Sequence, residues 1–316
     1  MIIREIEAGS GVFGISPAGD GVKIEYYRGK DISASVPESI EGRPLTEIGK
    51  KAFLGIKTLL RISLPDTVES IGDWAFASCS ALEEIELPQR KITFGNGLFK
   101  DCDKLLRVKV RKSGGNKERE TFLDKEEVGK SLRDSMEDDL AYLLALAVSK
   151  LDAGYLLDTE RAGSPEWTGS LDGLLRTMLG RDDSEGFSKM LLCGEEDYVG
   201  DESNLDTYIL LRKREKVRAL LIRFLHDGGL SENDREVFGE YLKQNMQAVV
   251  WPLVLEEHGS EREYFDLLIN IGCISEENIS RLIDSMGDRY TQMKGYLIRF
   301  KGESKGSGDP FGELEL

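Results

Sequence analysis

Few residues of this chain have the type and spacing that catalysis requires. Residues 129–131 (Gly-Lys-Ser) match the end of a phosphate-binding loop, but Asp124 stands where the first glycine of that loop belongs, so we expect an ordinary lysine. Asp101 and Asp103 lack the distal glutamate of an EF-hand calcium loop, and a solvated turn is predicted there.

The two histidines, His226 and His258, each precede a glycine near the end of a predicted helix, where an imidazolium interacts favourably with the helix dipole. Neither pairs with an identifiable nucleophile or base. The four cysteines form no CxxC pair, which disfavours a zinc site. We therefore expect no catalytic residue, no cofactor and no bound metal.

The elements that position the polar residues are units of a 23-residue repeat, which begin at Ile48, Ile71 and Phe94 and have a glycine in second place. An apolar alternation later in each unit predicts a short strand, and Pro65 and Pro88 end two of these strands. A single unit cannot bury its own apolar face, whereas stacked units share a core. The matching apolar columns are Phe53, Phe76 and Phe99; Leu59, Leu82 and Leu105; Ile62, Ile85 and Val108; and Leu64, Leu87 and Val110.

These columns, together with the extended stretch from Val22 to Tyr26, resemble the BspA-type leucine-rich repeat family over roughly residues 10–110. The resemblance implies a solenoid whose surfaces bind other molecules. The phenylalanine turns are expected on its convex side and the strands on its concave side. Lys91 stands in the column of Val68, with Ile92 displaced by one position, and a local irregularity is predicted there.

Cys79 and Cys102 share one repeat column. Stacked strands lie about 4.8 Å apart, so a disulfide between these cysteines is geometrically feasible. A ladder of buried thiols is the favoured alternative.

Charge and composition predict a multi-domain chain. Residues 1–112 carry 17 Lys and Arg against 16 Asp and Glu, whereas the rest carries 25 against 42. The predicted fold is a β-rich leucine-rich-repeat solenoid of 23-residue repeats followed by an all-α helical-repeat domain. The expected boundaries are a repeat domain at 1–112, a linker at 113–121, an acidic helical domain at 122–301 and a disordered tail at 302–316.

The helical part contains a second internal similarity. Residues 224–234 resemble residues 268–278, and both predict a helix, a glycine C-cap and a new helix. Ser231 and Ser260 are candidate N-caps. The pattern is similar to degenerate ankyrin-type or other α-solenoid repeats, and the combined arrangement is similar to that of bacterial repeat proteins.

The candidate partner-binding residues lie between the buried columns of the strands and are predicted to point outward on the concave face. Because Glu84 and Glu86 are expected to be exposed, reversing their charges should spare folding. An alternative is that these charges merely pair across strands. The six residues are Arg61, Ser63, Glu84, Glu86, Arg107 and Lys109.

Residues 90–112 form a basic segment with eight Lys and Arg against two Asp. These charges either keep the open edge of the last repeat soluble or dock it on the acidic helices of the same chain. The sequence favours neither alternative.

The leading functional hypothesis is a non-enzymatic protein-interaction module with an unknown protein partner. The alternatives are a structural or regulatory protein that self-associates through its helical half, and an enzyme with an unrecognised site. The net charge of −16 argues against nucleic acid as a partner. The apolar runs are too short to span a membrane, and the first residues lack a leader pattern, so a cytoplasmic location is expected.

Overall fold

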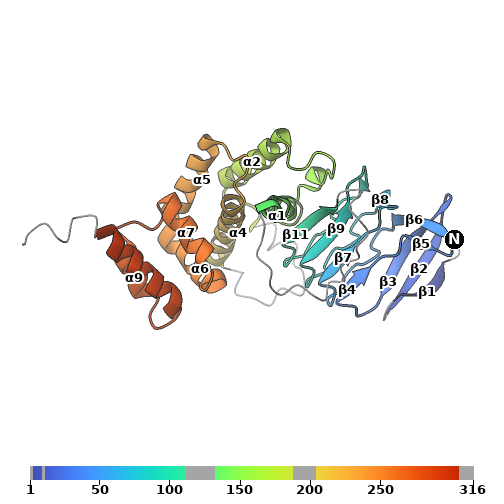
Figure 1. Ribbon diagram of the computed structural model, residues 1–316, viewed down its shortest axis with the longest axis horizontal. Coiled ribbons are helices and arrows are strands. Elements are labelled where there is room, and N and C mark those ends of the chain that lie inside the picture. Colours follow the sequence, from blue (N-terminus) through green and yellow to red (C-terminus); the bar gives the residue numbers. More distant parts are fainter. Residues whose placement is uncertain (1–2, 9–10, 112–131, 188–203, 306–316) are drawn as a thin grey trace, which may run out of the picture. The chain divides into compact units, whose positions relative to one another are not determined.

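The computed structural model describes residues 3–8, 11–111, 132–187 and 204–305. The chain divides into two compact units, residues 1–175 and 176–316. All described strands belong to the first unit, and the second is helical (Figure 1). The predicted fold class is confirmed, because a β-solenoid with a 23-residue spacing precedes an all-α region.

The repeat winds between two sheets of the first unit. One has the order β1-β2-β3-β6-β8-β10, with β5 paired to β6, and the other has the order β11-β9-β7-β4. Strands β1 to β3 form antiparallel pairs, whereas the strands from successive repeats pair in parallel. The strands are β1 (Arg4–Ala8), β2 (Gly11–Ala18), β3 (Gly21–Arg28), β4 (Ser33–Ser35), β5 (Ser39–Ile40), β6 (Arg43–Ile48), β7 (Arg61–Ser63), β8 (Ser70–Ile71), β9 (Glu84–Pro88), β10 (Thr93–Phe94) and β11 (Arg107–Arg111).

A column of stacked phenylalanines forms the centre of the solenoid core. The ring centroids of Phe53 and Phe76 lie 5.2 Å apart, and those of Phe76 and Phe99 lie 5.7 Å apart. The backbone follows the same stacking, since the amide of Phe53 donates to the carbonyl of Ala75 at 2.7 Å. All three rings are buried, as the repeat pattern predicts.

The glycine in second place of each unit permits this close stacking. A Cβ added to Gly72 would lie 2.6 Å from the backbone nitrogen of Lys50, and one added to Gly95 would lie 2.3 Å from that of Asp73. Any side chain at this position would push successive turns apart, because such contacts are well inside van der Waals distance.

The two cysteines of the shared column form the predicted thiol ladder and not a disulfide. Cys79 and Cys102 are free and buried. Their thiols donate to the carbonyls of Phe53 and Phe76, at 3.0 and 3.1 Å. Burial raises the pKa of Cys79, and it raises the pKa of Cys102 to about 12.

The irregularity predicted near Lys91 is also present. Lys91 is exposed, and Ile92 is buried in its place. The 23-residue register is restored directly afterwards, because Thr93 pairs with Ser70.

A helical segment follows the solenoid, and its first helix covers the solenoid end. The segment consists of α1 (Leu132–Ala145), the π-helical turn η1 (Leu146–Lys150), the 3-10 turn η2 (Gly154–Leu156) and α2 (Pro165–Gly180). Helix α1 packs along β11, so Val108 of this last strand is fully buried (Figure 1). Lys150 donates to the carbonyl of Asp103 at 3.0 Å, and Thr159 donates to that of Arg90 at 2.6 Å.

This division of the chain differs from the predicted one. The sequence places the helical domain at 122–301, whereas the first compact unit extends to residue 175. The physical reason is that the last repeat needs an apolar cover, and helix α1 supplies it. The predicted linker at 113–121 lies outside the described residues.

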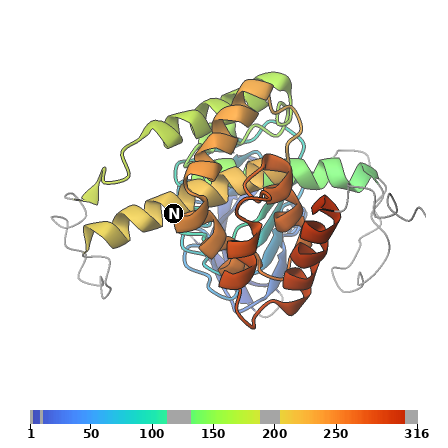
Figure 2. The same ribbon diagram turned by 90° about the vertical axis from the view of Figure 1, so that its left-hand side faces the viewer.

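The second unit is built around α4 (Leu205–Leu225), which contacts α5, η4 and α7 (Figures 1 and 2). Its other elements are α5 (Glu232–Gln244), the π-helical turn η4 (Met246–Val250), α6 (Trp251–His258), α7 (Arg262–Ile271), α8 (Ile279–Ser285) and α9 (Thr291–Lys305). Helix α9 includes residues 302–305, which were predicted to belong to the tail, and residues 306–316 lie outside the described part.

The helix ends confirm some of the predicted caps. Ser231 accepts from the amide of Asp234 and is the N-cap of α5, and Gly272 ends α7 in the left-handed conformation. The prediction that Ser260 is an N-cap was wrong, because the N-cap of α7 is Glu261. His226 and His258 lie at the ends of α4 and α6, as expected. The type of helical repeat stays a prediction.

We predict that Phe76→Ala lowers the free energy of unfolding by about 3–5 kcal/mol, because the ring is fully buried between two neighbours. This corresponds to a fall in Tm of roughly 6–20 °C for a unit of this size, measured by circular dichroism. Leu54→Ala is the control, since Leu54 is 43% exposed. A fall as small as that of the control would contradict the stacked core.

The buried thiols give a second prediction. In a Cys193→Ser variant, which removes the cysteine outside the described residues, Ellman's reagent should not react at pH 8 with the folded protein. Cys79, Cys102 and Cys273 are buried, and burial raises the pKa of each thiol. In guanidinium all three should react. A disulfide between Cys79 and Cys102 would instead leave one thiol to react after unfolding.

Candidate protein-interaction surface

All six residues predicted to bind a partner lie on one side of the sheet formed by β4, β7, β9 and β11, which we call the four-stranded face. The opposite side of this sheet carries the buried column of Ile62, Ile85 and Val108. The strand register aligns the outward residues in two rows. The first row is Ser33, Arg61, Glu84 and Arg107, and the second is Ser63, Glu86 and Lys109.

Glu84 is not the exposed residue that strand alternation predicts. Its side chain is only 7% exposed, because Arg107 and Lys109 cover it. The Arg107 Nε lies 2.8 Å from Glu84 Oε2, and the Lys109 Nζ lies 3.3 Å from the same oxygen. The expectation that Glu84 is exposed was therefore wrong, and we now expect reversal of its charge to destabilise the fold. Two long cationic side chains from the next strand fold over the carboxylate and exclude water.

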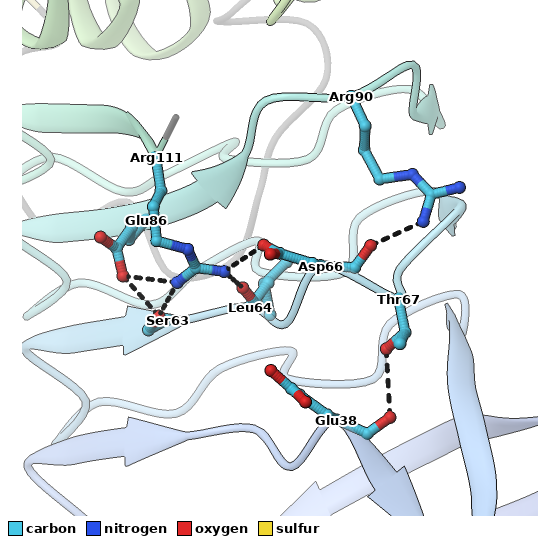
Figure 3. A network of polar contacts seen from close by, with 8 residues as sticks. All are labelled: Glu38, Ser63, Leu64, Asp66, Thr67, Glu86, Arg90 and Arg111. Atoms are coloured by element: carbon cyan, nitrogen blue, oxygen red, sulfur yellow. Dashed lines mark hydrogen bonds and ion pairs between the residues drawn. The ribbon is translucent and has the colours of Figure 1, made fainter. Parts of the chain in front are cut away.

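Glu86 is held by a network that spans three turns (Figure 3). Ser63 donates to Glu86 Oε2 at 2.6 Å, and the Arg111 Nη1 donates to the same oxygen at 3.0 Å. The Arg111 Nη2 reaches further back, to the carbonyl of Leu64 at 2.9 Å and to Asp66 Oδ1 at 2.7 Å. A single guanidinium thus ties β11 to β9, to β7 and to the loop after β7.

The charge of Arg111 is stabilised by these contacts. Burial disfavours the charged guanidinium, but the hydrogen bond to Asp66 and the nearby carboxylate of Glu86 outweigh burial and raise the pKa of Arg111 above its ordinary value. Each terminal nitrogen of the planar guanidinium contacts two acceptors: Nη1 contacts Ser63 and Glu86, and Nη2 contacts Leu64 and Asp66. The single ammonium group of a lysine could not reproduce this geometry.

The network continues along the loops that follow the strands (Figure 3). Arg90 donates to the carbonyl of Asp66 at 2.6 Å, and Thr67 donates to the carbonyl of Glu38 at 3.1 Å. Side chains of one turn therefore satisfy backbone carbonyls of the preceding turn, which holds this edge of the solenoid in register.

Arg111 is the residue that the sequence analysis missed. It stands 23 residues after Pro88, which itself stands 23 residues after Pro65. The replacement of the proline by an arginine in the last unit was the signal that could have identified Arg111. A long arginine side chain at this position can contact the ends of the strands in the preceding turns.

The alternative that charges pair across strands is supported for both carboxylates. Arg61 behaves differently. It lies opposite Glu84 in the register, but it forms no ion pair with any residue that the structure describes. The side chains of Arg107 and Lys109 are 30% and 39% exposed, so part of each cation remains open to solvent.

The basic segment at 90–112 pairs mainly with earlier repeats. Arg90, Arg107 and Arg111 all contact carboxylates of preceding turns. Among the described residues, the hydrogen bonds between this segment and the helical segment come from the side chains of Lys150 and Thr159, which donate to the carbonyls of Asp103 and Arg90, and not from ion pairs with acidic helices. Among the described residues, no helix is long and apolar enough to cross a membrane.

Residues 34–127 match the family described as BspA type leucine rich repeat region, in six copies. The repeats of this chain are therefore of the BspA type. Leucine-rich-repeat proteins are generally protein-interaction modules, and their fold is typically non-enzymatic. No match was found among curated proteins.

Solved structures of leucine-rich repeat proteins are similar to about a third of this chain. The Treponema pallidum leucine rich repeat protein is 37% identical over 33% of this chain and 49% of that chain, with a TM-score of 0.30. This chain thus spans about half the length of that protein. A leucine rich cell surface protein from Faecalibacterium prausnitzii is 26% identical over 34% of this chain and 32% of that chain, with a TM-score of 0.28. A Bacteroides capillosus leucine-rich repeat protein is 23% identical over 34% of this chain and 98% of that chain, with a TM-score of 0.26.

We predict that Glu84→Lys lowers the free energy of unfolding by about 3–5 kcal/mol, because it leaves three cations together at a buried position. The measurement is denaturation in guanidinium. The control, Glu83→Lys, makes the same change of charge at a half-buried neighbour and should cost no more than about 1 kcal/mol. Equal stability of the two variants would show that Glu84 is solvated.

Proposed function

We propose that this chain is a non-enzymatic protein-interaction module and that its partner binds on the four-stranded face. The observation that carries the proposal is the pair of outward rows, in which polar side chains are fixed by the strand register and by contacts between turns. A surface whose side chains are already ordered loses little conformational entropy on binding.

The partially exposed cations are the best candidates for contact with a partner. Arg61 has no ion-pair partner among the described residues, and Lys109 is 39% exposed. Glu84 and Glu86 have a different role in the proposal. They hold the neighbouring cations in place and are not themselves the contact residues.

We propose a reducing compartment such as the cytoplasm for this module. Cys79 and Cys102 occupy adjacent turns of the solenoid and are both free. Disulfides persist in oxidising compartments and are rare where thiols are kept reduced, so this pair of stacked thiols supports the proposal.

The experiment is site-specific photo-cross-linking in cells. Ser33, which is exposed at the start of the first row, is replaced by p-benzoylphenylalanine. We expect an adduct with a second protein at this position. The matched control carries the same cross-linker at Lys50, an exposed residue in a turn between the two sheets. Adducts at Lys50 without adducts at Ser33 would place the binding surface elsewhere.

The same experiment tests self-association through the helical half. Cross-linking of two copies of the chain from a position on α4, such as the exposed Leu210, would support that alternative. If adducts with another protein form from Ser33 and none form from Leu210, the four-stranded face is the binding surface.

A further inference from the structure

We propose that the partner segment bound by the four-stranded face is an acidic, extended stretch of protein. This inference rests on the proposed function and adds the chemistry of the ligand. It begins from the charge of the face, whose outward strand positions carry four cations against two carboxylates. Asp66, which pairs with Arg111 from the loop after β7, makes the balance four against three, whereas the whole chain has a net charge of −16. The charged residues at the outward strand positions are Arg61, Arg107, Lys109, Arg111, Glu84 and Glu86.

Both carboxylates of the face already have cationic partners within the chain. Glu84 is covered by two cations, and Glu86 accepts from Ser63 and Arg111. They therefore offer little to a basic partner. A cationic segment would also meet the exposed parts of Arg107 and Lys109, which are 30% and 39% exposed, and like charges would repel it.

The donors of the face are only partly used. Among the described residues, Arg107 forms an ion pair with Glu84 alone, and its Nε lies 2.8 Å from Glu84 Oε2. Lys109 shares that same carboxylate, so two cations divide one negative charge. Arg61 has no ion pair with a described residue. A ligand with carboxylates would supply acceptors for these cationic donors. Hydrogen bonds between charged groups are stronger than those between neutral groups.

The placement of these donors fits an extended segment. Arg61 and Arg107 lie on strands on either side of Glu84, which puts their backbones about 10 Å apart. Carboxylates two residues apart on an extended chain lie on one side of it, about 7 Å from each other, within reach of these long side chains. Beside Arg61 the residues are small, namely Ser33 in the same row and Ser63 in the next, and they leave room for a backbone to pass.

A peptide fits the face better than a nucleic acid does. A phosphate backbone carries negative charge at every step, and it would lie over Glu84 and Glu86 as well as over the cations. Discrete carboxylates on a peptide can be placed opposite the donors alone. The net charge of −16 also repels a polyanion at long range more than it repels a short segment with few charges.

The test measures fluorescence anisotropy of a labelled twelve-residue peptide of alternating Glu and Ser, titrated with the full chain at low salt. Arg61→Gln and Lys109→Gln should each weaken binding about two- to fivefold, the range that a single exposed ion pair contributes. Arg61→Gln breaks no ion pair with a described residue, and Lys109→Gln leaves Arg107 on Glu84, so both variants should melt like the wild type. Lys50→Gln removes a charge outside the face and should leave affinity unchanged. A matching peptide of Lys and Ser should not bind.

Three results would overturn the inference. One is no binding of the Glu-Ser peptide, and another is binding that neither face variant weakens. The third is tighter binding of a twelve-nucleotide single-stranded DNA with the same dependence on Arg61, which would identify a nucleic-acid site. Failure of the peptide alongside an adduct at Ser33 would reject the acidic partner and leave the proposed function standing. Loss of the Ser33 adduct, by contrast, would reject the proposed surface itself.

Discussion

The distance at which one turn of the solenoid stacks on the next is the constraint on which the rest of the first unit depends. The glycine column sets it, since Gly72 and Gly95 leave no room for a Cβ against the preceding turn. At this separation the backbone of each turn hydrogen-bonds to the next, and the rings of Phe53, Phe76 and Phe99 stack. A wider spacing would lose the ladder and the packing together, because both fall off steeply with distance.

The same spacing produces the chemistry of the four-stranded face. Parallel strands in register bring residues that are 23 positions apart in the sequence into direct contact. Glu84 therefore meets Arg107, and Glu86 lies beside Ser63. Long basic side chains on the last strand then fold back over acidic residues of the strand before it. These contacts hold the side chains of the face in place. The groups of the face that can still bind a ligand are the partly exposed cations, which donate hydrogen bonds.

The ends of a solenoid need separate solutions, because stacking satisfies only the turns in the middle. At the start, the antiparallel strands β1, β2 and β3 precede the first parallel pair. At the other end, α1 packs along β11, and Val108 is buried although its strand is the last. The helical segment up to residue 175 therefore belongs to the solenoid as its cover.

The sequence by itself determined the repeat, its 23-residue period, the apolar columns and the thiol ladder, because each of these follows from a periodic pattern of residue types. The columns are buried except at Val110 of the last strand, which is half-buried. Strand alternation also predicted that Arg61, Ser63, Glu84, Glu86, Arg107 and Lys109 share one side of a sheet, which the register shows, whereas their role in binding stays a prediction. Only the tertiary structure decided that Glu84 is buried, that Arg111 bridges three turns, and that residues 132–175 pack with the repeats. Strand alternation predicts the face of the sheet on which a side chain lies. Its solvent exposure also depends on whether long side chains of the neighbouring strand cover it. Helical periodicity likewise marks an apolar face without saying which surface that face will cover.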